Sequence, residues 1–403
     1  MAAFSPSQFR ASFLGPLAGL MLLALAGCNN SDLTPDTFDT VATGLNGGVG
    51  RAFHGAVTLP GSADVLLVGG QDGNGLPLMG TFFAERYRWG GRLFTVEPDF
   101  DFSFGRVNPR AASVGSDVVV AGGQVTGVIP GAATAPEYLA PVTPAEDGEW
   151  VGPPANITLP GGARGAALVR DGISLYLIGG VNQGTGLSNE IRAYEGGGVF
   201  GAAIATLSTA REGHTATRLA DGTILVVGGW GAAGIPMRSA EICDLPALGC
   251  APVSMPLLPR AGHTATASAD GTKVLILGGF KAVGVLAASG EAAEVYDLGA
   301  GLFRPVTSGA VAFPRVYHSA TLLDNGDILA VGGVVDNAGA VSGGAQVFTP
   351  GTEALRDTSG SLALARFGHS ATVLIDGTVL VAGGLSGALA PVIDAERYVP
   401  LGL

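Results

Sequence analysis

The sequence has few charged residues, and its basic residues form no cluster. Asp, Glu, Lys and Arg make up 13% of the 403 residues, about half of the roughly 25% that is usual. The 21 Lys and Arg against 33 Asp and Glu give a formal net charge of −12. Proteins that bind nucleic acids carry a basic patch or stripe. The composition therefore argues against a nucleic-acid partner.

Common catalytic and metal-binding motifs are also missing from the sequence. It contains no Gly-x-Ser-x-Gly elbow, no His-Glu-x-x-His, no Gly-x-x-x-x-Gly-Lys phosphate loop and no complete Asp-x-Asp-x-Asp-Gly calcium loop. We therefore expect no catalytic residue, no cofactor and no metal, although an enzyme remains the alternative.

Long apolar runs are rare, and the longest lies at the N-terminus. Arg10 is the only charge before Cys28, and the run from Phe13 to Ala26 is short for a membrane span. It ends in Leu-Ala-Gly-Cys28, which resembles a bacterial lipobox. The resemblance implies cleavage before Cys28 and attachment of lipid to it, which gives stable anchoring. An ordinary signal peptide is the alternative.

From this reading we predict three regions in the chain. Residues 1–28 would be a lipoprotein signal peptide ending at the lipidated Cys28, and residues 29–35 a short polar tether. Residues 36–403 would form the folded domain. The protein would be exported and held on a bacterial envelope membrane.

Seven copies of one pattern organise the folded region. Each begins with Arg and ends in an apolar run closed by Gly-Gly, as in REGHTATRLADGTILVVGG from Arg211. Successive doublets lie 49 to 57 residues apart, and a period near 50 residues is typical of propeller arrays. The blades are expected to start near Arg51, Arg110, Arg164, Arg211, Arg260, Arg315 and Arg366.

With these repeats the chain resembles the kelch family, in the variant found in bacterial proteins and in the central domain of galactose oxidase. The resemblance covers residues 36–403 and implies an all-β, seven-bladed β-propeller with four antiparallel strands per blade. The last repeat ends before a fourth strand, and Phe38 has the spacing of a fourth strand. We therefore expect the N-terminal segment to complete the last blade and close the ring.

Arg and Glu recur at fixed places in the repeat. The structural interpretation is a ring of Arg–carboxylate bridges, and the alternative is an anion site lined by Arg. The expected ring consists of the seven repeat arginines together with Glu85, Glu137, Glu190, Glu241, Glu294 and Glu396, and Gln346 is the one departure.

All five histidines lie three residues after a repeat Arg. They are His54, His214, His263, His318 and His369. Metal sites need several ligands that converge on one point, whereas one His per blade spreads them around an axis. We therefore expect a structural network of His and hydroxyl groups.

Three cysteines are present, and Cys28 is assigned to lipid. Cys243 and Cys250 are seven residues apart in the fourth repeat, where a hairpin would bring them together. In an exported protein they can form a disulfide, although two buried thiols are the alternative. Neither position suits the Tyr–Cys cross-link of galactose oxidase, so its copper site is not carried over.

The loops after the Gly-Gly doublets differ most between the repeats. Trp230 and Phe280 directly follow their doublets in adjacent repeats and would be binding anchors if exposed. The expected binding face on these loops comprises Trp230, Phe280, Gln71, Gln124 and Asn182. We expect a monomeric, non-catalytic scaffold that binds a protein or glycan partner there. The alternative is an exported enzyme that rearranges or oxidises sugars at the axial mouth.

Overall fold

The computed structural model describes most of the chain from Thr34 onward. The described residues are 34–42, 44–45, 50–78, 84–96, 107–115, 117–123, 164–182, 186–196 and 199–403. The chain divides into two compact units, Met1–Pro35 and Asp36–Leu403. Within the described residues, no helix has the length and apolar character needed to cross a membrane.

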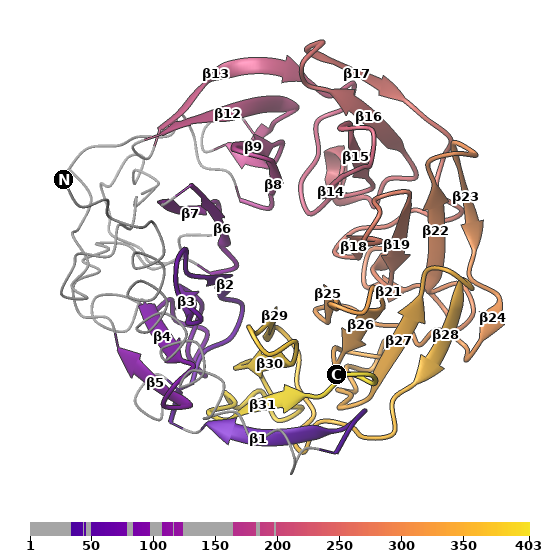
Figure 1. Ribbon diagram of the computed structural model, residues 1–403. Helices are drawn as coiled ribbons and strands as arrows, with labels where there is room; N and C mark the ends of the chain where they lie inside the picture. Colours follow the sequence, from indigo (N-terminus) through magenta and orange to yellow (C-terminus); the bar gives the residue numbers. More distant parts are fainter. Residues whose placement is uncertain are drawn as a thin grey trace, which may run out of the picture. The chain divides into compact units, whose positions relative to one another are not determined.

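The second unit is an all-β propeller, in which twisted sheets stand around a central axis (Figure 1). The first three blades in chain order are antiparallel sheets of four strands. Their strands are β2 (Gly55–Thr58), β3 (Val65–Val68), β4 (Ala84–Arg88) and β5 (Leu93–Val96); β8 (Ala167–Asp171), β9 (Ser174–Ile178), β12 (Glu190–Gly196) and β13 (Val199–Thr206); and β14 (Thr215–Arg218), β15 (Ile224–Val227), β16 (Ala240–Asp244) and β17 (Gly249–Pro252).

Three further blades follow, and the second of them gains a short parallel strand, β24. Their strands are β18 (Thr264–Ala267), β19 (Lys273–Leu277), β22 (Ala293–Asp297) and β23 (Leu302–Pro305); β24 (Ser308–Gly309), β25 (Ser319–Leu322), β26 (Ile328–Val331), β27 (Ala345–Thr349) and β28 (Ala354–Asp357); and β29 (Ser370–Val373), β30 (Val379–Ala382), β31 (Ala395–Tyr398) and β1 (Phe38–Ala42).

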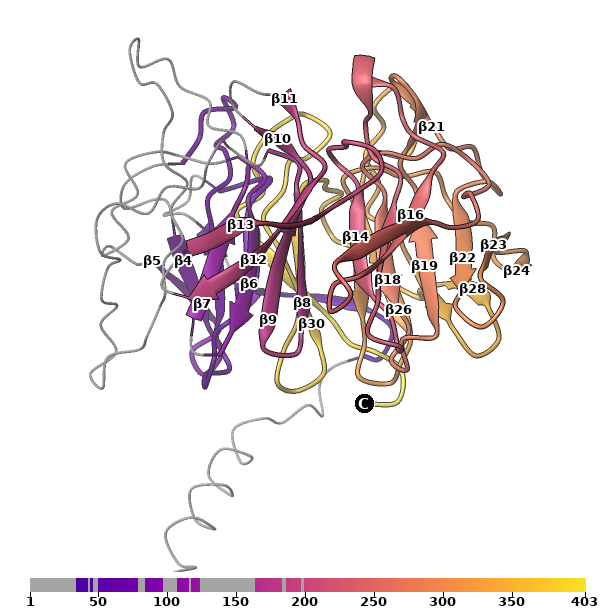
Figure 2. The ribbon, with the colours of Figure 1, turned by 90° about the horizontal axis from the view of Figure 1, so that it is seen from above.

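Small elements decorate the loops between the second and third strands. They are the hairpins β10–β11 (Val181–Asn182, Gly186–Leu187) and β20–β21 (Phe280–Ala282, Val285–Leu286) and the 3-10 turn η5 (Ala232–Gly234). Figure 2 shows β10, β11 and β21 on one face of the propeller, with the C-terminus on the other.

The prediction of seven four-stranded blades closed into a ring is wrong, because the described part of the chain holds six blades, five of four strands and one that gains β24. Among the described residues, the repeat assigned to Arg110 shows a two-stranded sheet, β6 (Arg110–Val114) with β7 (Asp117–Ala121). Its next residues, 124–163, lie outside the described part of the chain. The seven repeats therefore exceed the six blades that the described residues form.

The predicted pairing of the N-terminal segment with the last repeat is confirmed. β1 runs antiparallel to β31, with Phe38 opposite Tyr398. Asp36, just before β1, accepts hydrogen bonds from the Tyr398 hydroxyl (2.7 Å) and from Arg356 of the preceding blade (2.8 Å). The backbone N–H of Ser359 also donates to Asp36 (2.9 Å). One buried carboxylate therefore fastens the start of the propeller to its last two blades.

The apolar second strands supply the core, and the Gly-Gly doublets let neighbouring blades approach. β3, β15, β26 and β30 are buried along their whole length, which is expected for strands covered on both faces. At Gly228, a Cβ would lie 2.2 Å from the Arg260 carbonyl oxygen of the next blade. Because this contact excludes any side chain, glycine is required there.

Five repeat arginines are buried, and their side chains form ion pairs and hydrogen bonds within their own blades. Arg260 shows the pattern: its guanidinium donates to Glu294 (2.5 Å) and to the Gly278 carbonyl (2.7 Å), while its own carbonyl accepts from Gly229 of the preceding blade (2.7 Å). The corresponding side-chain pairs are Arg51–Glu85, Arg211–Glu241, Arg315–Gln346 and Arg366–Glu396.

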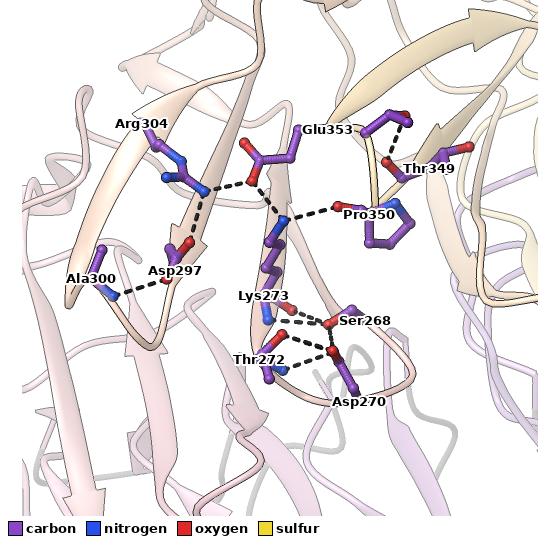
Figure 3. Close-up of polar contacts among 11 residues, drawn as sticks. Ser268, Asp270, Thr272, Lys273, Asp297, Ala300, Arg304, Thr349, Pro350 and Glu353 are labelled. Carbon is purple, nitrogen blue, oxygen red and sulfur yellow. Dashed lines mark hydrogen bonds and ion pairs between the residues drawn. The ribbon is translucent and has the colours of Figure 1, made fainter.

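A second polar cluster joins two blades at their outer strands (Figure 3). Glu353, which precedes β28, accepts from Lys273 (2.8 Å) and also pairs with Arg304 of β23. Arg304 in turn pairs with Asp297 (2.7 Å) of its own blade. These side chains are partly exposed, so the cluster contributes less than the buried pairs.

Candidate functional site at the axial mouth

A cavity of about 780 Å³ opens at the axis of the propeller. Ligand pockets commonly have volumes of about 300–1,000 Å³. Its walls come from the connections that lead into the first strands and from residues next to the Gly-Gly doublets. The loops between the second and third strands leave from this same face, seen in Figure 2.

The rim of the cavity is built from one backbone position per repeat, which we call the mouth position. At all seven of these residues φ is positive, between 53° and 65°. They are Phe53, Asn108, Gly165, Gly213, Gly262, Tyr317 and Gly368. Backbone hydrogen bonds join neighbours along the rim, for example from Phe53 N–H to Gly368 (2.7 Å) and from Gly368 N–H to Tyr317 (2.8 Å).

Two mouth positions carry aromatic residues in a conformation that favours glycine. Phe53 has φ 53° and Tyr317 has φ 55°, and a bulky side chain there is strained by about 1–2 kcal/mol. Tyr317 is 45% exposed, and both side chains line the cavity. Strain of this kind is often found at functional sites.

These two rings belong to a continuous aromatic arc. Successive ring centroids are 5.7 Å apart from Trp230 to Phe280, 6.1 Å from Phe280 to Tyr317 and 5.4 Å from Tyr317 to Phe53. Phe367 lies against both Phe53 (5.9 Å) and Tyr317 (6.2 Å). Aromatic faces at such distances pack favourably and offer a large apolar surface to a ligand.

Glycines at three of the other mouth positions leave room for the arc. A Cβ on Gly213 would meet the Trp230 ring at 3.0 Å, and one on Gly368 would meet the Phe53 ring at 2.9 Å. The Phe280 ring lies farther from Gly262, at 3.8 Å. The arc therefore depends on the mouth glycines as well as on its own rings.

Four histidines lie below the rim and bond to hydroxyl groups of the preceding blade. The Nε2 atoms of His263, His318, His369 and His54 contact Thr215 (2.9 Å), Thr264 (2.9 Å), Ser319 (3.0 Å) and Ser370 (2.8 Å) respectively. Burial, followed by the nearby Arg260, lowers the pKa of His263 to about 3. These histidines are therefore neutral blade-to-blade links at ordinary pH.

His214 is the exception, because among the described residues its ring bonds to no side-chain hydroxyl group. In the other pairs the partner of the histidine is a Thr or Ser, whereas the equivalent residue before His214 is Ala167. The strand register shows the equivalence, because Ala167 lies opposite Ile178 and Thr215 lies opposite Val227. Burial, followed by Arg211 and Arg110, lowers the pKa of His214 to about 3.

Arg110 and Arg164 do not belong to the buried Arg–carboxylate set and instead line the cavity. Arg110 pairs with Ala121 in β6–β7, so it stands where β2 has Gly55. Arg164 forms an isolated antiparallel β-bridge with Val181, and Glu212 forms the equivalent bridge with Trp230. Because Glu212 directly follows the repeat Arg211, Arg164 stands one residue beyond the repeat Arg position. It pairs with Glu212 through two hydrogen bonds (2.8 and 3.0 Å).

Glu190 also differs from the expected arrangement. Arg192, opposite Leu177, stands where β16 has Glu241 opposite Val226. Glu190 lies two residues earlier and pairs with Arg192 itself (2.7 Å). In this repeat the ion pair of Glu190 therefore lies within one strand, β12, and does not involve the repeat Arg position.

The residues expected on the binding face are only partly brought together. Trp230, Phe280 and Gln71 line the cavity, whereas Asn182 pairs with Gly186 in the β10–β11 hairpin and does not line it. Gln124, Glu137 and Cys28 lie outside the described residues.

Cys243 and Cys250 lie opposite each other on β16 and β17 and are joined by a disulfide with a sequence separation of seven residues. In the described part of the chain, no group of three or more His, Cys, Asp or Glu side chains is arranged to hold a metal ion.

Sequence reasoning missed the aromatic mouth positions and the cavity-facing Arg110. A usable signal was present, because the residue two after the repeat Arg is Gly in three copies but Phe53 and Tyr317 in two.

In comparisons with known proteins, no family model and no curated protein matches this sequence.

Proposed function

We propose that this protein is a non-catalytic binding module whose ligand enters the axial mouth. The observation that carries the proposal is the placement of Phe53 and Tyr317 at strained mouth positions. Together with Trp230 and Phe280 they form an apolar wall in a cavity of ligand size. A structural role alone would be met by glycine, as in neighbouring repeats.

The finer features of the proposal rest on the sequence. The Gly-Gly doublets and the buried Arg–carboxylate pairs support a kelch-type propeller, and the Leu-Ala-Gly-Cys28 segment supports export with a lipid anchor on Cys28. The protein would present its mouth to a protein or glycan partner in the cell envelope.

Crosslinking capture from native envelopes tests this function, with wild type compared against a Trp230→Ala/Phe280→Ala variant. We expect wild type to retain a specific partner that the variant loses, because the variant removes two of the five rings in the aromatic arc. Recovery of the same partner by both proteins would show that the mouth is not the binding site. Thermal denaturation of the variant provides the folding control.

A further inference from the structure

The cavity wall carries a cation that has no counter-charge among the described residues. The charged residues that line it in this part of the chain are Arg110, Arg164 and Glu212. Arg164 is neutralised by its two hydrogen bonds to Glu212. Within the described residues, Arg110 makes no hydrogen bond or ion pair.

The position of Arg110 in the repeat makes this charge specific to one blade. The equivalent residues in the other repeats are Gly55, Ala167, Thr215, Thr264, Ser319 and Ser370, which are all small. Only β6 begins with a long, charged side chain at this place among the described first strands. The arginine is therefore not required by the repeat architecture.

The surroundings of Arg110 favour pairing with an anion. Arg110 is an exposed residue that faces the cavity, although the protein atoms crowded around its guanidinium lower the pKa of that group by desolvation. The pKa of Arg51 is also lowered by burial, but there Glu85 opposes the effect. A partly desolvated guanidinium gains most from a carboxylate, which it can bind through two parallel hydrogen bonds.

The remaining lining groups point to the rest of the ligand. The aromatic arc offers flat apolar faces, and Gln71 and Asn108 add neutral polar side chains to the same cavity. Sugar rings have apolar C–H faces that stack on aromatic rings and hydroxyl groups that suit amide side chains. An uncharged aromatic or aliphatic ligand would leave Arg110 desolvated without compensation.

We propose that the cavity binds acidic sugars, with Arg110 pairing with the sugar carboxylate and the aromatic arc stacking on the sugar ring. This inference rests on the proposed binding function and narrows its ligand to a glycan that carries carboxylates. The chain is strongly acidic, with a net charge of −12, so a local cation in the mouth would also oppose repulsion of such a ligand.

Calorimetric titration of the full-length protein tests the inference with oligosaccharides of glucuronic or galacturonic acid and with their methyl esters. The ester keeps the ring and removes the charge. We expect wild type to prefer the acid over the ester by about tenfold to a hundredfold, as a charge-assisted hydrogen bond would give. Equal binding of acid and ester would overturn the role of the carboxylate.

Two variants separate the contributions. Arg110→Gln should bind acid and ester alike, with ester affinity unchanged, whereas Arg170→Gln, the same change at an exposed site on β8 outside the cavity lining, should leave the preference intact. If Arg110→Gln fails to fold, the wild-type comparison and an Arg110→Lys variant, expected to keep a reduced preference, still decide the question.

Other outcomes distinguish this inference from the proposed function. Failure of wild type to bind any uronic-acid oligosaccharide would overturn the acidic-sugar assignment, while envelope capture would still test the mouth as a binding site. Tight binding instead of peptides that require a free terminal carboxylate, lost in Arg110→Gln, would reassign the ligand to protein.

Discussion

At the scale of single residues, the mouth positions show how a strained backbone can indicate function. Tyr317 keeps a left-handed conformation although glycine serves the same backbone role at Gly262 and Gly368. The Tyr317 ring packs against three other rings, yet almost half of the residue is exposed toward the cavity. A strained residue that keeps an exposed aromatic face in a cavity is why we assign the ring to a ligand.

Replacement of this residue separates stability from binding. Tyr317→Gly should change the free energy of unfolding by no more than about 1 kcal/mol, because relief of strain offsets the entropy of glycine and the lost ring contacts. Ligand binding should fall. Chemical denaturation checks the first effect, and Tyr317→Ala, which keeps the strain, is the matched control. A clear loss of stability in Tyr317→Gly would show that the ring is mainly structural.

A second residue-scale prediction concerns His214, which lacks the hydroxyl partner of the other histidines. Ala167→Ser places a hydroxyl where Thr215, Ser319 and their equivalents bond a histidine. It should stabilise the protein by about 0.5–1.5 kcal/mol. Urea denaturation measures the gain. Ala166→Ser, the adjacent change with no histidine opposite, should give none, and a gain there of equal size would refute the pairing.

At the scale of strands and repeats, the sequence predicted the elements better than their register. The apolar run that precedes Gly228-Gly229 forms β15, which is buried along its whole length, because an apolar run is a local signal. The repeats near Arg110 and Arg164 lack the His–hydroxyl markers, so the nearest Arg was assigned to the wrong position. Register depends on hydrogen bonds between strands, which the spacing of a single arginine does not determine.

The candidate site was predicted only in part for a related reason. Trp230 and Phe280 were found because they directly follow the doublets, but their approach to Tyr317 and Phe53 depends on the arrangement of separate blades. Asp36 was likewise not singled out, since its partners Arg356 and Tyr398 lie more than 300 residues away in the sequence.

The attachment of β1 provides an element-scale prediction. Asp36→Ala removes the carboxylate that joins β1 to Arg356, Ser359 and Tyr398, and should lower the free energy of unfolding by roughly 2 kcal/mol. Calorimetry should show a lower melting temperature. Thr40→Ala, at an exposed position of β1, is the control and should change little. Equal effects of the two changes would contradict the anchoring role.

At the scale of the whole molecule, the buried histidines should make the propeller sensitive to acid. Burial lowers the pKa of His214, His263 and His369 to about 3, against about 6.5 in the unfolded chain. The unfolded state therefore binds more protons below pH 6.5, and folding stability falls as the pH drops from about 6.5 toward 3. At pH 5.5 each such histidine should lower the free energy of unfolding by roughly 1.4 kcal/mol.

Unfolding titrations between pH 7 and pH 4.5 check this prediction. The pKa of the Asp36 carboxylate is lowered, so the stability that Asp36 contributes is present across this range and is lost mainly at lower pH. The slope of the free energy of unfolding against pH gives the number of protons taken up on unfolding, and His263→Gln should lower that number by one. A slope that is flat in wild type, or unchanged in His263→Gln, would show that these histidines are not buried in the neutral form.

The central claim, that the axial mouth is the binding site, is tested most directly by site-specific photocrosslinking in native envelopes. A photoreactive residue would replace Tyr317 at the mouth or Ile173, which is 90% exposed on the β8–β9 turn at the opposite face. We predict a discrete adduct at the Tyr317 position and none at the Ile173 position. An adduct at Ile173 alone, or the same adducts at both, would contradict the account.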